Sequence, residues 1–162
     1  MKLTIKLAAR SAAIILLAVT TLLSACQEQS EATDSGGLTV SDASVRLPVA
    51  GGDVSSAYLT IRNKGVTDRE LLSASSPHAK TIEIHEHIHA EGSMRMRQLP
   101  ALGIPAGSTA TLESGGTHLM LFQLDERLRD KRGGTLLEVP LSLHFDNDET
   151  VTVHARLKSV LD

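Results

Sequence analysis

Short apolar runs separated by turn residues recur along the chain from Leu38 to its end. The segment Thr150–His154 alternates polar and apolar residues, as a strand with one buried face does. The breaks between runs are rich in Gly, Pro, Asn and Asp, which is typical of all-β chains. The pattern predicts these strands: Leu38–Leu47, Ser55–Asn63, Glu70–Ser75, Thr81–Ile88, Ser93–Leu99, Thr109–Glu113, His118–Leu124, Thr135–Phe145 and Thr150–Leu157. Only Asp125–Lys131 is expected to form a helical turn. Seven to nine strands in about 125 residues favour a single Greek-key β-sandwich domain.

The first 26 residues have the pattern of a bacterial lipoprotein leader. Three cations precede an apolar run from Ala12 to Leu23, which is shorter than the roughly 20 residues that span a bilayer. The run ends in Leu-Ser-Ala-Cys26, which resembles a lipobox, although an ordinary cleaved signal with an incidental cysteine gives the same pattern. We expect a signal peptide at 1–25, a lipidated Cys26 with a flexible tether at 26–37, and a domain at 38–162. The protein is then anchored to a bacterial membrane, facing the periplasm, and Gln27 favours the outer membrane.

Composition excludes several classes of function. The net charge of −3 and the lack of a long basic run argue against nucleic acid as a partner. Aromatic residues are few, so the core must consist of Leu, Val, Ile and Ala. Cys26 is the only cysteine, so the domain has no disulfide and no thiolate of the kind that blue-copper electron carriers use. Neither Ser108 nor Ser114 lies in a Gly-x-Ser-x-Gly elbow, and no nucleophile–base pair is evident, so we do not expect an enzyme.

Imidazole and thioether side chains gather in three of the predicted strands and the loop at residues 89–92. Three of the four methionines and four of the seven histidines lie between residues 85 and 120. Thioether sulfur suits Cu(I), and imidazole suits copper in general. Taken singly, the methionines can be core residues and the histidines a solvated strand face. Their concentration favours a copper site.

Strand geometry predicts which of these side chains meet. His118 and Met120 are two apart, so they leave the same face of one strand. We expect residues 89–92 to form a four-residue hairpin loop. This register places several pairs directly opposite one another, with Cβ atoms about 4.5–5.5 Å apart: His85 with Met96, His87 with Met94, Glu86 with Arg95, and Ile84 with Arg97.

The spacing His85-x10-Met96-x21-His118-x-Met120 resembles the signature of the periplasmic copper A chaperone (PCu(A)C-type) family. Other segments, such as Ala57–Asn63 and Pro140–Phe145, are similar to the family as well. The resemblance implies a cupredoxin-like sandwich that binds one Cu(I) through those four residues. It further implies a monomer that delivers copper to a copper-accepting protein, a cytochrome oxidase subunit during assembly of its copper site or a second copper chaperone.

The chain also departs from the family pattern. Ser44 and Thr117 stand where aromatic residues are common, which leaves fewer rings around the site. His87 replaces a frequent methionine, and with His89 it offers a second, nitrogen-rich set for Cu(II). Met94 is expected to pack beside the site rather than to bind metal. The alternative function is an envelope lipoprotein that buffers Cu(II) or Zn(II), or confers copper resistance, through His85, His87 and His89. A purely structural lipoprotein is a further alternative.

Overall fold

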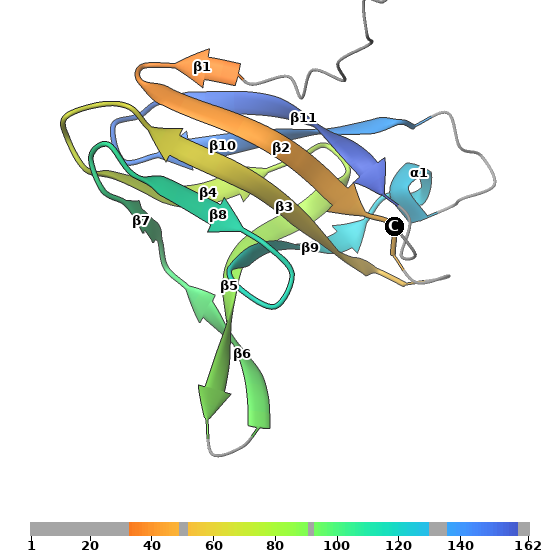
Figure 1. Cartoon of the computed structure of the whole chain (residues 1–162). Helices are drawn as coiled ribbons and strands as arrows, with labels where there is room; N and C mark the ends of the chain where they lie inside the picture. The colour runs from red at the N-terminus through yellow and green to blue at the C-terminus, as the bar shows by residue number, and fades with distance from the viewer. Residues whose placement is uncertain (1–32, 49–51, 91–92, 130–135, 159–162) are drawn as a thin grey trace, which may run out of the picture.

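The computed structural model describes residues 33–48, 52–90, 93–129 and 136–158 (Figure 1). The expected signal peptide and the lipidation site at Cys26 lie outside the described residues. Nearly all described elements are strands, so the all-β expectation is confirmed. No helix in the described ranges is long and apolar enough to cross a bilayer.

The elements, in chain order, are β1 (Thr33–Ser35), β2 (Leu38–Arg46), β3 (Val54–Asn63), β4 (Arg69–Ser75), β5 (Ala79–Ala90), β6 (Ser93–Leu99), β7 (Leu102–Ile104), β8 (Thr109–Leu112), β9 (His118–Leu124), α1 (Glu126–Arg129), β10 (Glu138–Phe145) and β11 (Thr150–Lys158). All nine expected strands are found, with ends that differ by three residues at most. Two short strands were not expected. β1 falls within the stretch expected as tether and pairs with β2 across Gly36 and Gly37, which both have positive φ. β7 pairs with β4.

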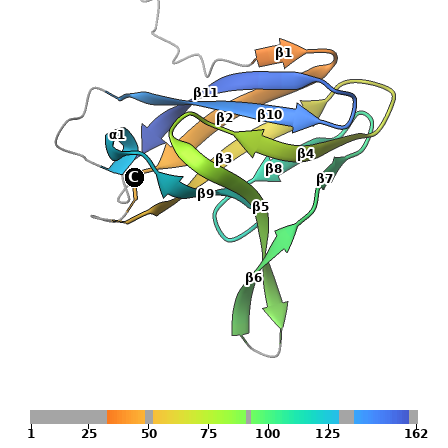
Figure 2. The same ribbon diagram turned by 180° about the vertical axis from the view of Figure 1, so that it is seen from behind.

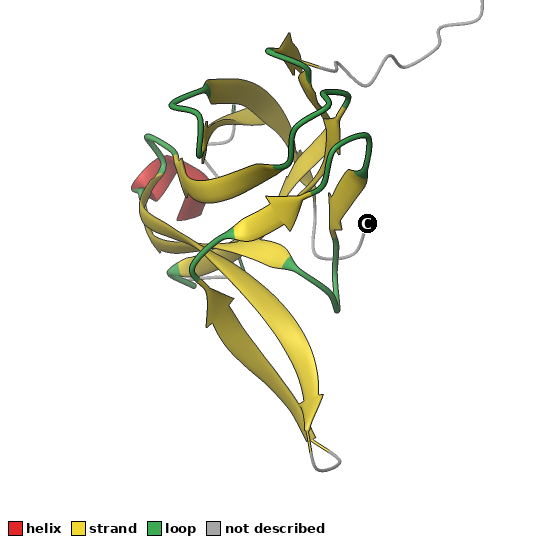
Figure 3. Ribbon diagram, turned by 90° about the vertical axis from the view of Figure 1, so that its left-hand side faces the viewer, coloured by secondary structure: helices red, strands yellow, loops and turns green. Residues whose placement is uncertain are grey.

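The strands form one hydrogen-bonded ladder in the order β6-β5-β9-β3-β2-β11-β10-β4-β7, with β1 beside β2 and β8 beside β3. The pairs are antiparallel except β2 with β11, which is parallel. The sheet is curled, so that β7 at one end of this order contacts β3 and β8. The reverse view shows β10 and β4 closing the back of the domain (Figure 2). The β5–β6 hairpin projects away from the rolled sheet (Figure 3).

The core lies inside the rolled sheet and is aliphatic apart from Phe145, much as the composition predicted. Inward and outward positions alternate along β10, where Val139, Leu141 and Leu143 are fully buried. Each such side chain contributes about 1.5–3 kcal/mol when it is removed from water. β6 differs, because six of its seven residues are exposed. The projecting hairpin therefore has little core of its own to fix its register.

One helical turn, α1, follows the C-terminal end of β9. The Asp125 Oδ1 atom accepts a hydrogen bond from the Leu128 amide at 3.0 Å, which is the contact of a helix N-cap. Its Oδ2 atom lies 2.9 Å from His78 Nδ1. Burial alone would raise the pKa of Asp125, but the hydrogen bonds from His78 and Leu128 and the nearby cations outweigh burial and lower this pKa below its ordinary value. Asp125 thus ties α1 to the turn before β5.

Candidate metal centre

The pairing of β5 with β9 brings together residues that are far apart in the sequence. The antiparallel register sets His85 opposite His118 and Glu83 opposite Met120. Ile84, between the two β5 residues, is buried in the core. His85, His118 and Met120 therefore leave the opposite face of these strands from the core residues. The ring centroids of the two histidines are 6.3 Å apart.

The expected register of the β5–β6 hairpin is wrong by two residues. Met96 lies opposite His87, not opposite His85, and Met94 lies opposite His89. Because the shift is an even number, every side chain keeps its expected face. His85 and Met96 become diagonal neighbours, for which a separation of about 7–8 Å is usual and long side chains still reach.

Side-chain pairing across the hairpin explains the observed register. Arg97 lies opposite Glu86, and its Nε atom donates to Glu86 Oε1 at 2.9 Å. Leu99 lies opposite Ile84, so apolar meets apolar. The expected register would have placed Ile84 against Arg97, which leaves a buried side chain beside a cation.

A carboxylate orients the ring of His85. The Glu83 Oε2 atom lies 2.8 Å from His85 Nε2, and because an ionised carboxylate only accepts hydrogen bonds, Nε2 carries the proton. The lone pair is then on Nδ1, which is buried and has no hydrogen-bond partner. A metal-binding histidine is usually held in this way, with one ring nitrogen on a carboxylate and the other on the metal. The sequence contained a signal for Glu83, since it precedes His85 by two and so shares its strand face.

A backbone carbonyl orients the ring of His118. This side chain is buried, and its Nδ1 atom lies 3.1 Å from the carbonyl oxygen of Gly116, which leaves the lone pair on Nε2. Burial lowers the pKa of His118; the Gly116 hydrogen bond opposes this, and the neighbouring His87 and His85 add to it. The net effect favours the neutral imidazole, which is the form that binds a metal ion.

The loop between β8 and β9 fixes the position of that carbonyl. The Glu113 amide donates to the Thr117 carbonyl at 2.7 Å, and the Gly116 amide donates to the Glu113 carbonyl at 3.2 Å. Gly115 has φ +83°, a conformation that L residues other than glycine rarely adopt. The Gly116 oxygen also accepts the His87 amide at 3.3 Å, so one carbonyl holds both the loop and β5.

The other candidate residues occupy the projecting hairpin. The ring of His87 meets that of His118 edge to face at 5.1 Å, and its Nδ1 atom is buried without a hydrogen-bond partner. Met96 and Met94 are 53% and 58% exposed, so Met94 does not pack as expected. The side chain of His89 lies outside the described residues. No group of three or more His, Cys, Asp and Glu in the described ranges is placed to hold a metal ion.

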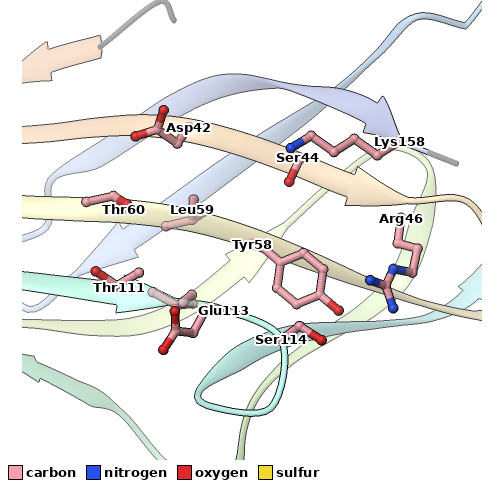
Figure 4. Close-up of a pocket in the computed structure, with 11 residues that line it drawn as sticks. Asp42, Ser44, Arg46, Tyr58, Leu59, Thr60, Thr111, Glu113, Ser114 and Lys158 are labelled. Atoms are coloured by element: carbon pink, nitrogen blue, oxygen red, sulfur yellow. The ribbon is translucent and has the colours of Figure 1, made fainter. Parts of the chain in front are cut away.

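Two aromatic rings that the sequence did not place lie beside the histidines. Tyr58 is 6.4 Å from His118, and Phe122 is 6.2 Å from His85, measured between ring centroids. They partly compensate for the aromatic positions that Ser44 and Thr117 leave empty. Tyr58 also borders a neighbouring groove of ≈ 290 Å³ (Figure 4). That groove is lined by residues of β2, β3, β8 and the following loop together with Lys158, and none of its lining residues is a histidine or methionine.

Solved structures with the same fold define the class of domain. The copper-bound PCuAC domain from PmoF2 superimposes with a TM-score of 0.63 at 18% identity, over 80% of this chain and 98% of that one. The Cu(I) form of DR1885 from Deinococcus radiodurans gives a TM-score of 0.59 at 26% identity, over 85% of each chain. The fold is the cupredoxin-like fold of PCuAC domains, so the expected fold and resemblance are confirmed.

The family follows from the sequence match. Residues 38–157 match the family described as "Putative lipoprotein LpqE-like", and the chain belongs to this family. The "Putative lipoprotein Lxx21020" of Leifsonia xyli subsp. xyli is 29% identical over 131 residues, which cover 80% of this chain and 75% of that protein.

Proposed function

We propose that this protein is a copper chaperone of the cell envelope, which binds one Cu(I) ion and transfers it to a copper-accepting protein. The ligands are the two imidazoles of His85 and His118 and the two thioethers of Met96 and Met120. The observation that carries the proposal is the buried, unpartnered Nδ1 atom of His85, whose Nε2 atom is held by Glu83 and which belongs to a residue directly opposite His118 in the β5–β9 ladder. The family, and the fold shared with a Cu(I)-bound relative, support it.

The donor set suits monovalent copper. Two neutral imidazoles and two thioethers add no negative charge, so they favour Cu(I) over Cu(II), and thioether is a poor ligand for hard cations. The lowered pKa of His118 reduces competition from protons. Three ligands belong to the paired β5 and β9 strands, whereas Met96 is on the exposed hairpin. The incoming ligands of a partner can therefore approach the ion from the Met96 side.

Location and destination complete the proposal. Two features support a lipid anchor at Cys26: the leader sequence, and the lipoprotein descriptions of the family and of the Leifsonia protein. The chaperone is anchored on the periplasmic side of a bacterial membrane, with the outer membrane favoured. The partner is an oxidase subunit during assembly of its copper site or a second copper chaperone. The chaperone works as a monomer and binds no nucleic acid.

The test is an anaerobic Cu(I) titration with X-ray absorption at the copper edge, on the mature chain carrying C26S so that no thiol competes. We expect one equivalent of copper with two nitrogen and two sulfur scatterers. Met96→Leu and Met120→Leu should each lose affinity, while Met94→Leu, a matched change on the same exposed strand, should not. No stoichiometric uptake, or a shell of nitrogen alone, would refute the proposal.

A histidine-based Cu(II) or Zn(II) buffer is the second candidate. The buried, unpartnered Nδ1 atom of His87 favours it, because this nitrogen lies outside the four-residue set. Zinc prefers nitrogen, thiolate and carboxylate ligands to thioether. A buffer of this kind would keep its affinity for Cu(II) and Zn(II) when Met96 and Met120 are leucine, so the same variants separate the two functions.

A further inference from the structure

The β5–β6 hairpin contains a donor pair that the four-ligand site does not explain. His87 and Met96 are directly opposite each other in the ladder, whereas His85 and Met96 are only diagonal neighbours. Directly opposed Cβ atoms lie about 4.5–5.5 Å apart, which is close enough for two side chains to share one ion. Met96 is therefore better placed to work with His87 than with His85. We call His87 and Met96 the outer pair.

His87 is also the histidine nearest to the ring of His118. Their centroids are 5.1 Å apart, compared with 6.3 Å between His85 and His118. The Gly116 carbonyl fixes this spacing, because it accepts both the His87 amide and the His118 ring. The Nδ1 atom of His87 is buried and has no hydrogen-bond partner, whether it carries a lone pair or an N–H.

From this geometry we propose that the outer pair is a second Cu(I) position through which the ion enters and leaves the site. The proposal rests on the proposed function, in which His85, His118, Met96 and Met120 hold the ion at rest. In the transfer step a Cu–N bond to His87 forms, the Cu–N bond to His85 and the Cu–S bond to Met120 break, and Met96 and His118 stay bound. Copper remains monovalent, and each imidazole binds it through a ring nitrogen that carries no proton.

The position of the outer pair suits this role. β5 is paired with β9 only as far as His85, and beyond it with β6 alone. An ion that moves from His85 to His87 thus leaves the rolled sheet for the projecting hairpin (Figure 3). There Met96 is half exposed, so a partner's ligands can reach the ion.

The experiment compares rates with equilibria for His87→Leu, on the mature chain carrying C26S. Anaerobic stopped flow follows Cu(I) release to an excess of a chromophoric Cu(I) chelator, and uptake from a weak Cu(I) complex. A group on the route lowers the barrier in both directions, so its loss should slow uptake and release by similar factors. We expect at least about tenfold, the lower end of what removal of a group supporting a metal site costs. The binding constant should change much less than either rate.

Three further variants keep the test decisive. His87→Met, which restores a soft donor, should recover most of both rates, even if the leucine variant folds poorly. His85→Leu should still bind copper, more weakly, through the outer pair and His118, and should release it faster than the wild type. His154→Leu, which removes an exposed histidine on β11, is the matched control and should not alter either rate.

The outcomes separate the two proposals. If the wild type takes up no Cu(I), the proposed function fails. If the wild type binds one Cu(I) but His87→Leu exchanges at the wild-type rate, the outer pair is refuted and the chaperone function stands. A His87→Leu variant that loses copper as completely as Met120→Leu also refutes the route, because His87 would then be a ligand at rest.

Discussion

The contact between Glu83 and His85 is the most direct place to test the site. Replacement of Glu83 by Gln keeps the shape of the side chain and removes the charge that sets the proton on Nε2 of His85. The two atoms are 2.8 Å apart, and the side chains are only 30% and 14% exposed, so water screens the contact weakly. Loss of such a supporting carboxylate typically lowers metal affinity 10–100-fold.

That range corresponds to about 1.4–2.7 kcal/mol of binding free energy. The Gln oxygen still accepts a hydrogen bond from Nε2, so Glu83→Gln should fall near the lower end, about tenfold. Glu83→Leu removes the acceptor as well and should approach the upper end, about 100-fold. Affinity is measured anaerobically by competition with a chromophoric Cu(I) chelator at neutral pH.

Glu86 supplies the matched control on the same strand. Its carboxylate pairs with Arg97 across the hairpin, and its side chain is 24% exposed, close to the value for Glu83. Partly exposed ion pairs contribute about 0–1 kcal/mol, so Glu86→Gln should change copper affinity by a few-fold at most. Equal losses of Cu(I) affinity for Glu83→Gln and Glu86→Gln would show that Glu83 does not orient His85 for metal binding. An unchanged affinity for Glu83→Gln would show the same. Nitrogen NMR shifts of His85 report the tautomer independently.

Four further variants test the fold. Leu121→Ala, at a fully buried β9 position, should lower the free energy of unfolding in urea by about 2–5 kcal/mol. Leu72→Ala, at a 45% exposed position, should change it by no more than about 0.5 kcal/mol. Equal losses for the two variants would contradict the assigned core. The lowered pKa of Asp125 adds stability that is present above its unfolded pKa of about 3.9 and is lost as pH falls through the lower folded pKa. Asp125→Asn keeps a good N-cap, so its urea stability should fall less steeply below about pH 4 than that of the wild type; parallel curves would refute this. Gly115→Ala should cost about 1–2 kcal/mol for its positive φ alone, because nothing lies within 4 Å of the added carbon, and an unchanged urea midpoint would contradict that strain.

The strands that the sequence predicted well share a strict alternation. Positions in β10 and β11 alternate between core and surface without a break, and the C-terminal end of β10 and both ends of β11 were predicted to within one residue. β1 and β7 were missed because three residues are too few for a periodic signal. In β1 the informative feature is instead the pair of glycines before Leu38, which favours a two-residue hairpin turn.

The hairpin register was mispredicted for a physical reason. The exposed β6 has little apolar face to bury, so the hydrophobic pattern does not select among registers that differ by two residues. The observed choice depends on specific pairs, Glu86 with Arg97 and Ile84 with Leu99. Glu86 lies opposite an arginine in both registers, so charge pairing alone does not distinguish them. The partner of Ile84 does, because it is Leu99 in the observed register and Arg97 in the expected one.

Residue spacing alone predicted only part of the candidate site. Residue spacing predicted His85 and His118 as ligands but gave neither their burial nor the nitrogen that each one presents. Those depend on Glu83 and on the Gly116 carbonyl. The carbonyl is positioned by a loop whose shape requires a glycine with positive φ, and no periodic pattern reports that.

β5 pairs with β9 along its first half and with β6 along its second half, so its two halves have different surroundings. Its first half is paired with β9 and backed by the core, so the rings of His85 and His118 are held by packing and by fixed hydrogen bonds. Its second half is paired with β6 alone, where most side chains face water and little apolar burial opposes local opening. A carrier must hold its ion selectively and still release it without unfolding. The proposed copper site meets both requirements, because Met96 on the exposed hairpin can leave the ion while His85 and His118 on the paired strands keep their geometry.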